Sequence, residues 1–219
     1  MEIAFDNSES HRGAPSTGAT WSHTITGDDP YLVVSASMES TSINVDTCTY
    51  DGDACAEVIE GVTNYGNHIH AKIAPAAGTA NVVVTLSSST YNMCVSASYT
   101  GVDQTTPVEA TSTSSGNSAT PSDSITTLTD GAWIYGLFGA DRAISGGTGI
   151  TEIEPTVSNQ EWAGDYDVVT AEAHGMSVVI SAGARAFGTC SIAFKPAGGG
   201  GGFTPTPMSH HLQMASGLV

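Results

Sequence analysis

The segment Tyr91–Tyr99, YNMCVSASY, has the period of two that decides the fold. Successive side chains of an extended strand point to opposite faces, so every second residue belongs to the same face. One face carries the larger, mostly apolar side chains, and the other carries small or polar ones. The first set is Tyr91, Met93, Val95, Ala97 and Tyr99, and the second is Asn92, Cys94, Ser96 and Ser98. This alternation predicts a β-strand.

The same period recurs along most of the chain. It is present in ATWSHTIT (19–26), NVVVTL (81–86), GMSVVIS (175–181) and TCSIAFK (189–195), and turn signals such as TGDDP and LTDG separate such segments. We expect about a dozen strands and no helix before the C-terminal tail. The sequence therefore predicts an all-β fold over residues 1–197, an antiparallel two-sheet β-sandwich of jelly-roll or Greek-key type. No internal repeat of the solenoid or propeller kind is evident.

The charge of the chain is strongly one-sided. Only 12% of its 219 residues are charged, and 22 acidic residues face five basic ones, which gives a net charge of −17. A chain this acidic repels phosphate backbones and anionic lipids. We therefore expect neither nucleic-acid nor membrane partners.

The first ten residues, MEIAFDNSES, include an acid at position 2 and lack the apolar stretch of a signal peptide. No apolar run approaches the length of a membrane span. The sequence predicts synthesis in the host cytoplasm without export, although its hydroxyl-rich composition suits an extracellular or virion protein. Release of virus particles by lysis would reconcile the two observations.

The segment CTYDGDAC (48–55) predicts a β-hairpin. The pair Asp51-Gly52 suits a two-residue type I′ turn. This register places Cys48 opposite Cys55 on one face of the hairpin. Two states of the pair stay open: a disulfide if the mature protein lies outside the cell, or two thiols after cytosolic synthesis.

Two histidines in NHIHAK, His68 and His70, share one face of a strand. Strand histidines two residues apart are a common start to a metal site. The glutamate that a cupin-like pattern would place a few residues later is missing, and sequence alone cannot show whether His23 or His174 completes a site. A solvated or interface face is the favoured interpretation, so we expect no metal site here.

Other acidic residues give little support for chemistry. Turn pairs such as Asp51 with Asp53 resemble calcium ligands but lack the EF-hand spacing, so ordinary turn roles explain them, with a structural calcium as the alternative. Two further segments supply the carboxylates of Glu152, Glu154, Glu161 and Asp165. A glycosidase needs two carboxylates in a cleft rich in aromatic residues, whereas the three Trp and seven Tyr are spread along this chain. We expect no catalytic residues, no enzyme activity and no cofactor.

Several longer segments carry a resemblance to a known family. They are FDNSES (5–10), TWSHTITGDDPYLVVSASM (20–38), TYDGDA (49–54), APAAGTANVVVTLSSS (74–89), YTGVDQTTPVEATST (99–113) and MSVVISAGARAFGTCSIAFKPAG (176–198). The chain from about residue 3 to 197 resembles the jelly-roll β-sandwich domains that recur in tailed-phage structural proteins and in surface proteins of environmental bacteria. The resemblance implies a binding or building module without a catalytic signature.

The C-terminal segment lies outside this resemblance. Five glycines, residues 198–202, form a flexible linker, and a tail of residues 203–219 follows. The tail begins with Phe203 and has an apolar stripe at helical spacing: Met208, Leu212, Ala215 and Val219. Such a short helix is marginal alone and would be stabilised by docking. We interpret the tail as an assembly anchor, with a frayed terminus as the alternative.

These observations predict a non-enzymatic virion structural protein of a tailed phage or virus. We expect a homo-oligomeric capsid decoration, turret or other exterior module whose tail docks on a capsid or tail protein or on neighbouring copies. The alternative is an extracellular carbohydrate-binding or adhesive module. In that case Trp162 and Tyr166, which flank acids and a glycine, would contact cell-surface glycans, whereas Trp21 and Trp133 would be core residues.

Overall fold

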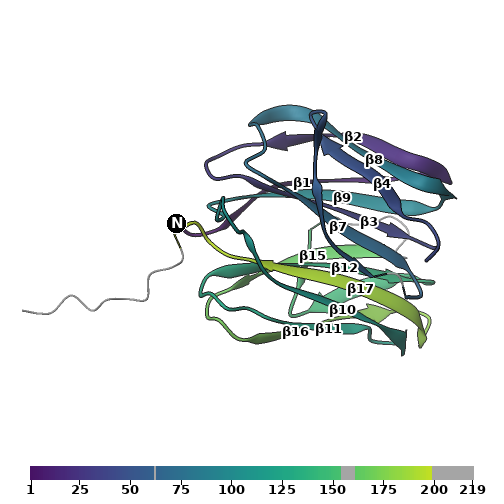
Figure 1. Cartoon of the computed structure of the whole chain (residues 1–219). Helices are drawn as coiled ribbons and strands as arrows, with labels where there is room; N and C mark the ends of the chain where they lie inside the picture. The colour runs from purple at the N-terminus through teal and green to yellow at the C-terminus, as the bar shows by residue number, and fades with distance from the viewer. Residues whose placement is uncertain (62, 154–160, 199–219) are drawn as a thin grey trace, which may run out of the picture.

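The computed structural model describes residues 1–61, 63–153 and 161–198, which form strands, turns and loops without a helix. Their strands make four antiparallel sheets that are stacked as layers (Figure 1). The predicted all-β antiparallel sandwich is confirmed. The number of layers differs from the prediction, because two sandwiches, not one, are packed against each other.

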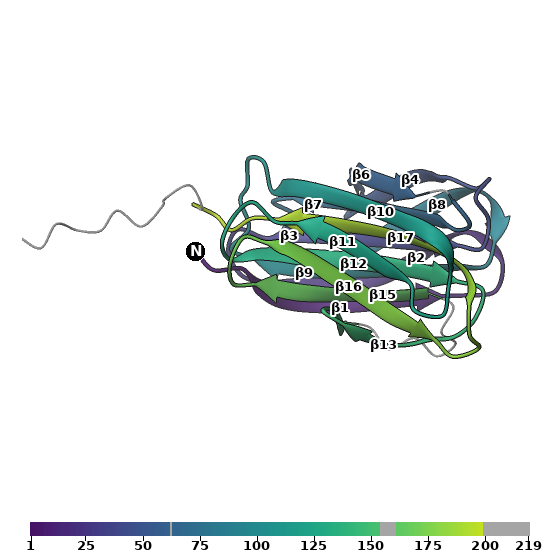
Figure 2. The ribbon, with the colours of Figure 1, turned by 90° about the horizontal axis from the view of Figure 1, so that it is seen from below.

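We name the four sheets by their place in the stack. The first outer sheet contains, in spatial order, β2 (Ser16–Ile25), β8 (Gly78–Thr90), β4 (Val45–Tyr50) and β5 (Asp53–Ala54). The first inner sheet contains β1 (Ala4–Arg12), β9 (Asn92–Thr100), β3 (Tyr31–Met38), β7 (Gly66–Ile73) and β6 (Ala56–Gly61). The second inner sheet contains β10 (Val108–Ser118), β17 (Arg185–Phe194), β12 (Ala132–Ala140), β15 (Glu161–Val168) and β14 (Thr151–Glu152). The second outer sheet contains β11 (Ser122–Thr126), β16 (Ala173–Ile180) and β13 (Ile144–Thr148), and Figure 2 shows it in front of its inner sheet.

A hydrophobic core fills each of the three gaps between neighbouring sheets. We call them the first core, between the first outer and first inner sheets, the middle core, between the two inner sheets, and the second core, between the second inner and second outer sheets. In β3, for example, Leu32 and Val34 face the first core, whereas Val33 faces the middle core between the two inner sheets. Central strands of the inner sheets, such as β3, are therefore buried on both faces. This includes β9, where Ser96 and Ser98 on the small, polar face are as fully buried as their apolar neighbours.

The first half of the chain, residues 1–102, has the strand pairing of a jelly roll. Its strands pair in nested order, β1 with β9, β2 with β8 and β3 with β7, and these pairs are divided between two facing sheets. The strand β6 pairs with β7, so it extends the inner sheet at its edge. The predicted jelly-roll type is thus confirmed for this half.

The second half, residues 108–198, repeats this arrangement, except that its outer sheet has three strands and no counterpart of β5. The pairs are β10 with β17, β11 with β16 and β12 with β15, and β14 extends the inner sheet as β6 does. The chain is therefore a tandem pair of jelly rolls whose inner sheets pack face to face. The duplication is not evident in the sequence, because the repeat is about 95 residues long and its two copies share a pattern more than they share residues.

The duplication extends to irregular features. The first strand of each half has a β-bulge near its start. The extra residue of β1 is Asp6, and its carboxylate accepts a hydrogen bond of 2.9 Å from the Thr26 amide. The extra residue of β10 is Glu109, which accepts one of 2.9 Å from the Leu128 amide. Both amides lie in the turn after the second strand, so one device fixes the same turn in both halves.

The described chain starts and ends at the same end of the body (Figure 1). The amino group of Met1 donates a hydrogen bond of 2.8 Å to the carbonyl oxygen of Ala197. The amide of Ala197 donates one of 2.7 Å to the carbonyl oxygen of Gly101, at the connection between the halves. We call this region the chain-end surface.

Candidate functional site

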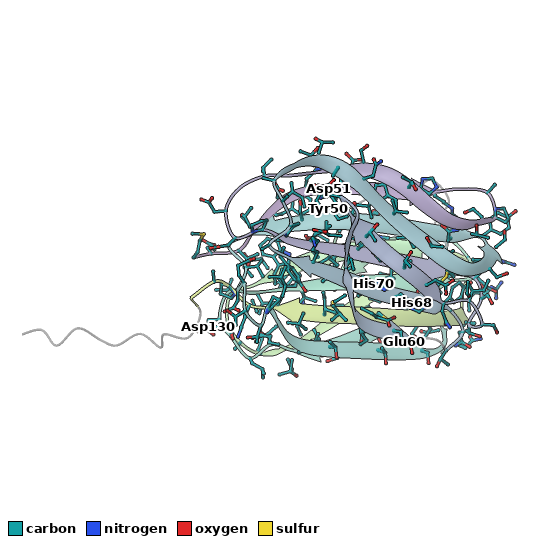
Figure 3. The ribbon with its side chains drawn as sticks, turned by 45° about the horizontal axis from the view of Figure 1, so that its top comes forward. Tyr50, Asp51, Glu60, His68, His70 and Asp130 are labelled. Atoms are coloured by element: carbon teal, nitrogen blue, oxygen red, sulfur yellow. The ribbon has the colours of Figure 1, made fainter. Side chains whose placement is uncertain are left out.

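A group of ligand-type side chains lies on the two edge-most strands of the first inner sheet. His68 of β7 is paired with Glu60 of β6, and Glu57 lies three residues before Glu60. The Nδ1 atom of His68 is 2.9 Å from Glu57 Oε1 and 4.0 Å from Glu60 Oε2. The His68 side chain is 1% exposed, whereas those of Glu57 and Glu60 are 46% and 55% exposed. A buried imidazole is thus faced by two carboxylates that solvent can reach; Figure 3 labels His68 and Glu60.

A β-bulge brings the two glutamates together. Residues three apart in a regular strand point to opposite faces. The register of β6 shifts between Glu57 and Ile59, so Val58 is the extra residue. The shift returns Glu60 to the face of Glu57, which is the face of His68. The sequence does not indicate this pair, because a strict period of two places Glu57 and Glu60 on opposite faces of the strand.

The surroundings of His68 include the second histidine of the predicted strand. His70 is buried and stacked on His68, with 6.4 Å between ring centroids, and burial lowers the pKa of His70 to about 4. The Nε2 atom of His68 is buried without a hydrogen-bond partner among the described residues. His70 and Glu57 also line an open hollow of about 330 Å³ beside the edge of the first outer sheet. The predicted face of His68 and His70 is therefore buried and not solvated.

The hairpin beside this hollow has the predicted geometry. Asp51 and Gly52 have φ values of +53° and +81°, as a type I′ turn requires. Tyr50 pairs with Asp53, and Figure 3 labels Tyr50 and Asp51 at the turn. The sequence prediction of this hairpin and its register is confirmed.

The cysteines of the hairpin, Cys48 and Cys55, lie opposite each other as free, buried thiols that also line the hollow. The Cys55 amide donates a hydrogen bond of 2.9 Å to the Cys48 carbonyl oxygen. A hydrogen bond between the two thiols raises the pKa of Cys48 and lowers that of Cys55. Both cysteines are thiols in this structure, and the disulfide stays a prediction for an extracellular form.

The other histidines considered as metal ligands lie elsewhere. His23 is buried under the first outer sheet, where Ser96 Oγ is 2.9 Å from its Nδ1 and Ser98 Oγ is 3.0 Å from its Nε2. Ser98 in turn donates to Asp6. Burial lowers the pKa of His23 to about 4. The Nε2 of His174 donates a hydrogen bond of 2.7 Å to a backbone carbonyl oxygen. Neither histidine joins His68.

The second half also has a buried polar cluster between its outer and inner sheets, as the first half has around His23. Asp123 accepts hydrogen bonds from the hydroxyls of Ser112 at 2.7 Å, Thr189 at 3.1 Å and Ser191 at 2.7 Å. It also accepts one of 2.8 Å from the Ser124 amide. A buried carboxylate with this many donors is fully satisfied, so the cluster has a structural role.

The predicted glycan-binding pair is not a surface pair. Trp162 is 1% exposed and packs edge to face on Phe138 in the second core, with 5.8 Å between centroids. Its prediction as a surface residue is wrong, because its strand is covered by the second outer sheet. Tyr166 is 38% exposed, and its ring is stacked on His174 at 4.2 Å. The glycan alternative therefore loses one of its two residues.

Among the carboxylates considered for catalysis, Asp165 is buried on β15 and accepts a hydrogen bond of 3.0 Å from the Tyr99 hydroxyl. Burial raises the pKa of Asp165 to about 6, and the hydrogen bond from Tyr99 partly opposes this shift. Glu152 is exposed on β14, and Glu154 lies outside the described residues. The structure thus places Glu152 and Asp165 in different environments.

The predicted tail residues Phe203, Met208, Leu212, Ala215 and Val219 lie outside the described residues. The point from which the tail starts is described. An open hollow of about 670 Å³ at the chain-end surface is lined by Met1, Glu2, Asp130, Gly131, Asp167, Val169 and Pro196. The Val169 side chain is largely exposed there. The chain-end surface therefore combines apolar side chains with carboxylates.

Comparisons with protein-family models, curated proteins and solved structures gave no match. None of the described segments forms a helix of the length and apolarity that crossing a bilayer requires.

Proposed function

We propose that this protein is a non-enzymatic structural protein of a virus particle, an exterior capsid or tail module of a tailed phage that its C-terminal tail holds in place. The observation that carries the proposal is the contact between Met1 and Ala197. It fixes the start of the linker at one end of a compact four-layer body. The module would then be tethered at its chain-end surface and would project its opposite end outward.

The distribution of charge supports this role for the tail. None of the 22 acidic residues lies after residue 197, and the segment 203–219 contains two histidines, His210 and His211. The acidic bodies of neighbouring copies repel one another, whereas the tail meets no such repulsion. The tail is therefore the segment suited to contact an acidic neighbour or a shell.

The chain-end surface offers a matching contact. Its hollow exposes the apolar side chains of Met1 and Val169 beside the carboxylates of Glu2 and Asp167. The apolar stripe of the C-terminal tail, which contains no acidic residue, would complement such a surface. Docking between copies would give the homo-oligomer that we expect of an exterior virion module.

Truncation after Gly198 tests the proposal. We expect the full chain to sediment as an oligomer and to bind virus particles from its source, as seen by immunogold labelling. The truncated chain should be a folded monomer that leaves particles unlabelled. A matched variant of full length, Met208→Asp with Leu212→Asp, should behave like the truncation because it breaks the apolar stripe. Assembly and labelling by the truncated chain equal to those of the full chain would refute the proposal.

A further inference from the structure

His68 occupies the position that a tryptophan occupies in the second half. It pairs with Ala36 of β3, and the equivalent pair in the second half is Trp162 with Phe138 of β12. There the two large rings fill the second core with apolar contacts. In the first half, a small residue faces a buried imidazole. A titratable side chain thus lies at the position where the other half has a large packing residue.

The atoms around His68 have the spacing of a metal site. One nitrogen of His68 and one oxygen each from Glu57 and Glu60 all lie within 4.8 Å of one another. Nitrogen and oxygen ligands bind zinc at about 2.0–2.2 Å, so the ligand atoms of one ion must come within about 4 Å of each other. The strand fixes the imidazole, and the half-exposed glutamates can close this small difference by changing rotamer.

Electrostatics favours a cation at this position. Two carboxylates approach each other on a chain of net charge −17. In the part of the chain that the structure describes, neither glutamate forms an ion pair with a lysine or arginine. Lys72, on the same strand as His68, pairs instead with Asp53 at 3.2 Å. A divalent ion would neutralise both carboxylates.

We propose that Glu57, Glu60 and His68 bind one divalent transition-metal ion of the zinc class. The imidazole nitrogen selects this class, because calcium and magnesium prefer oxygen ligands throughout. Water completes the coordination on the open side of the glutamates. The ion joins the edge strand β6 to β7, and its binding goes beyond the proposed virion role.

Titration of the metal-free full chain with Zn²⁺ alone, in a reducing buffer without chelator, tests the site. Isothermal titration calorimetry should give one ion per chain, and Zn²⁺ should raise the Tm. Glu57→Gln and Glu60→Gln, both at half-exposed positions that folding tolerates, should each weaken binding at least about tenfold. His68→Gln should abolish saturable binding.

Two control variants exclude neighbouring ligands. His70→Gln, on the same face of the same strand, removes none of the three ligand atoms and should therefore keep saturable Zn²⁺ binding, unlike His68→Gln. The double variant Cys48→Ser with Cys55→Ser should also keep binding, and Co²⁺ spectra should show no thiolate band. Absence of saturable binding by the full chain, parent-like affinity of both glutamate variants, or equal losses in the His68 and His70 variants would overturn the proposal.

Discussion

Asp165 is a carboxylate whose titration should change the stability of the folded chain. It lies on β15 among the side chains of the middle core, where it accepts a hydrogen bond of 3.0 Å from the Tyr99 hydroxyl. Burial raises its pKa from 3.8 to about 6. Between these values the folded chain holds a proton that the unfolded chain has released. The free energy of unfolding therefore falls as the pH rises from 4 to 6, and the loss is complete above 6.

The size of the effect follows from the shift. A difference of roughly 2 pKa units corresponds to about 3 kcal/mol between the protonated and the ionised folded state. Asp165→Asn keeps an oxygen acceptor for Tyr99 and cannot ionise. Relative to the parent, this variant should gain about 3 kcal/mol more at pH 7.5 than at pH 4.0. Any fixed cost of the new amide group is the same at both pH values and cancels.

Guanidinium unfolding at pH 4.0 and 7.5, followed by tryptophan fluorescence, measures this difference. Asp46→Asn is the matched control, because Asp46 is exposed and its replacement removes one negative charge from the same acidic chain. The pH-dependent gain of Asp46→Asn measures how much stability the chain gains when repulsion among its acidic residues is reduced. A pH-dependent gain of Asp165→Asn no larger than that of Asp46→Asn would show that burial does not raise the pKa of Asp165.

His23 titrates in the opposite sense: burial lowers its pKa to about 4, so stability present above pH 6.5 is lost as the pH falls towards 4. Between pH 7 and 4 the parent should lose about 3 kcal/mol more than His23→Gln in guanidinium unfolding, and equal losses would contradict this. Asp123→Ala should lower the free energy of unfolding by roughly 3–5 kcal/mol in the same assay, because it leaves buried hydroxyls without their acceptor. A loss below about 1 kcal/mol would argue against a structural role of the Asp123 cluster. Gly101→Ala should cost at least about 2 kcal/mol, since φ is +71° and the added Cβ would lie 2.3 Å from the Glu2 carbonyl oxygen. Gly52→Ala, at φ +81° with open space, should cost about 1 kcal/mol, and a calorimetric Tm shift as large as that of Gly101→Ala would contradict the steric argument.

Local features were predictable from the sequence. The hairpin around Asp51 and Gly52 depends on two residues that accept positive φ values, and the cross-strand partners Tyr50 and Asp53 follow from the turn. The strand pattern likewise predicts the all-β class. These inferences need only neighbouring residues, which is why they hold.

Features that depend on distant segments were not predictable. Trp162 is flanked by polar residues, yet the second outer sheet covers it. The two glutamates meet His68 only because the bulge at Val58 breaks the period of two. The second sandwich was not predicted for a related reason. The strand β9 has one apolar and one small polar face, which is the pattern of a strand with one face in solvent, yet both of its faces are buried.

The route by which the chain leaves the body has a mechanical consequence. The last long strand, β17, lies between β10 and β12 and ends beside the linker. Antiparallel hydrogen bonds run perpendicular to the strands. A pull on the linker is therefore directed along β17, and the ladders on its two sides share the load and resist it in shear. A particle anchored through this segment would hold its pendant module by a strand that has to slide as a whole before the fold can open.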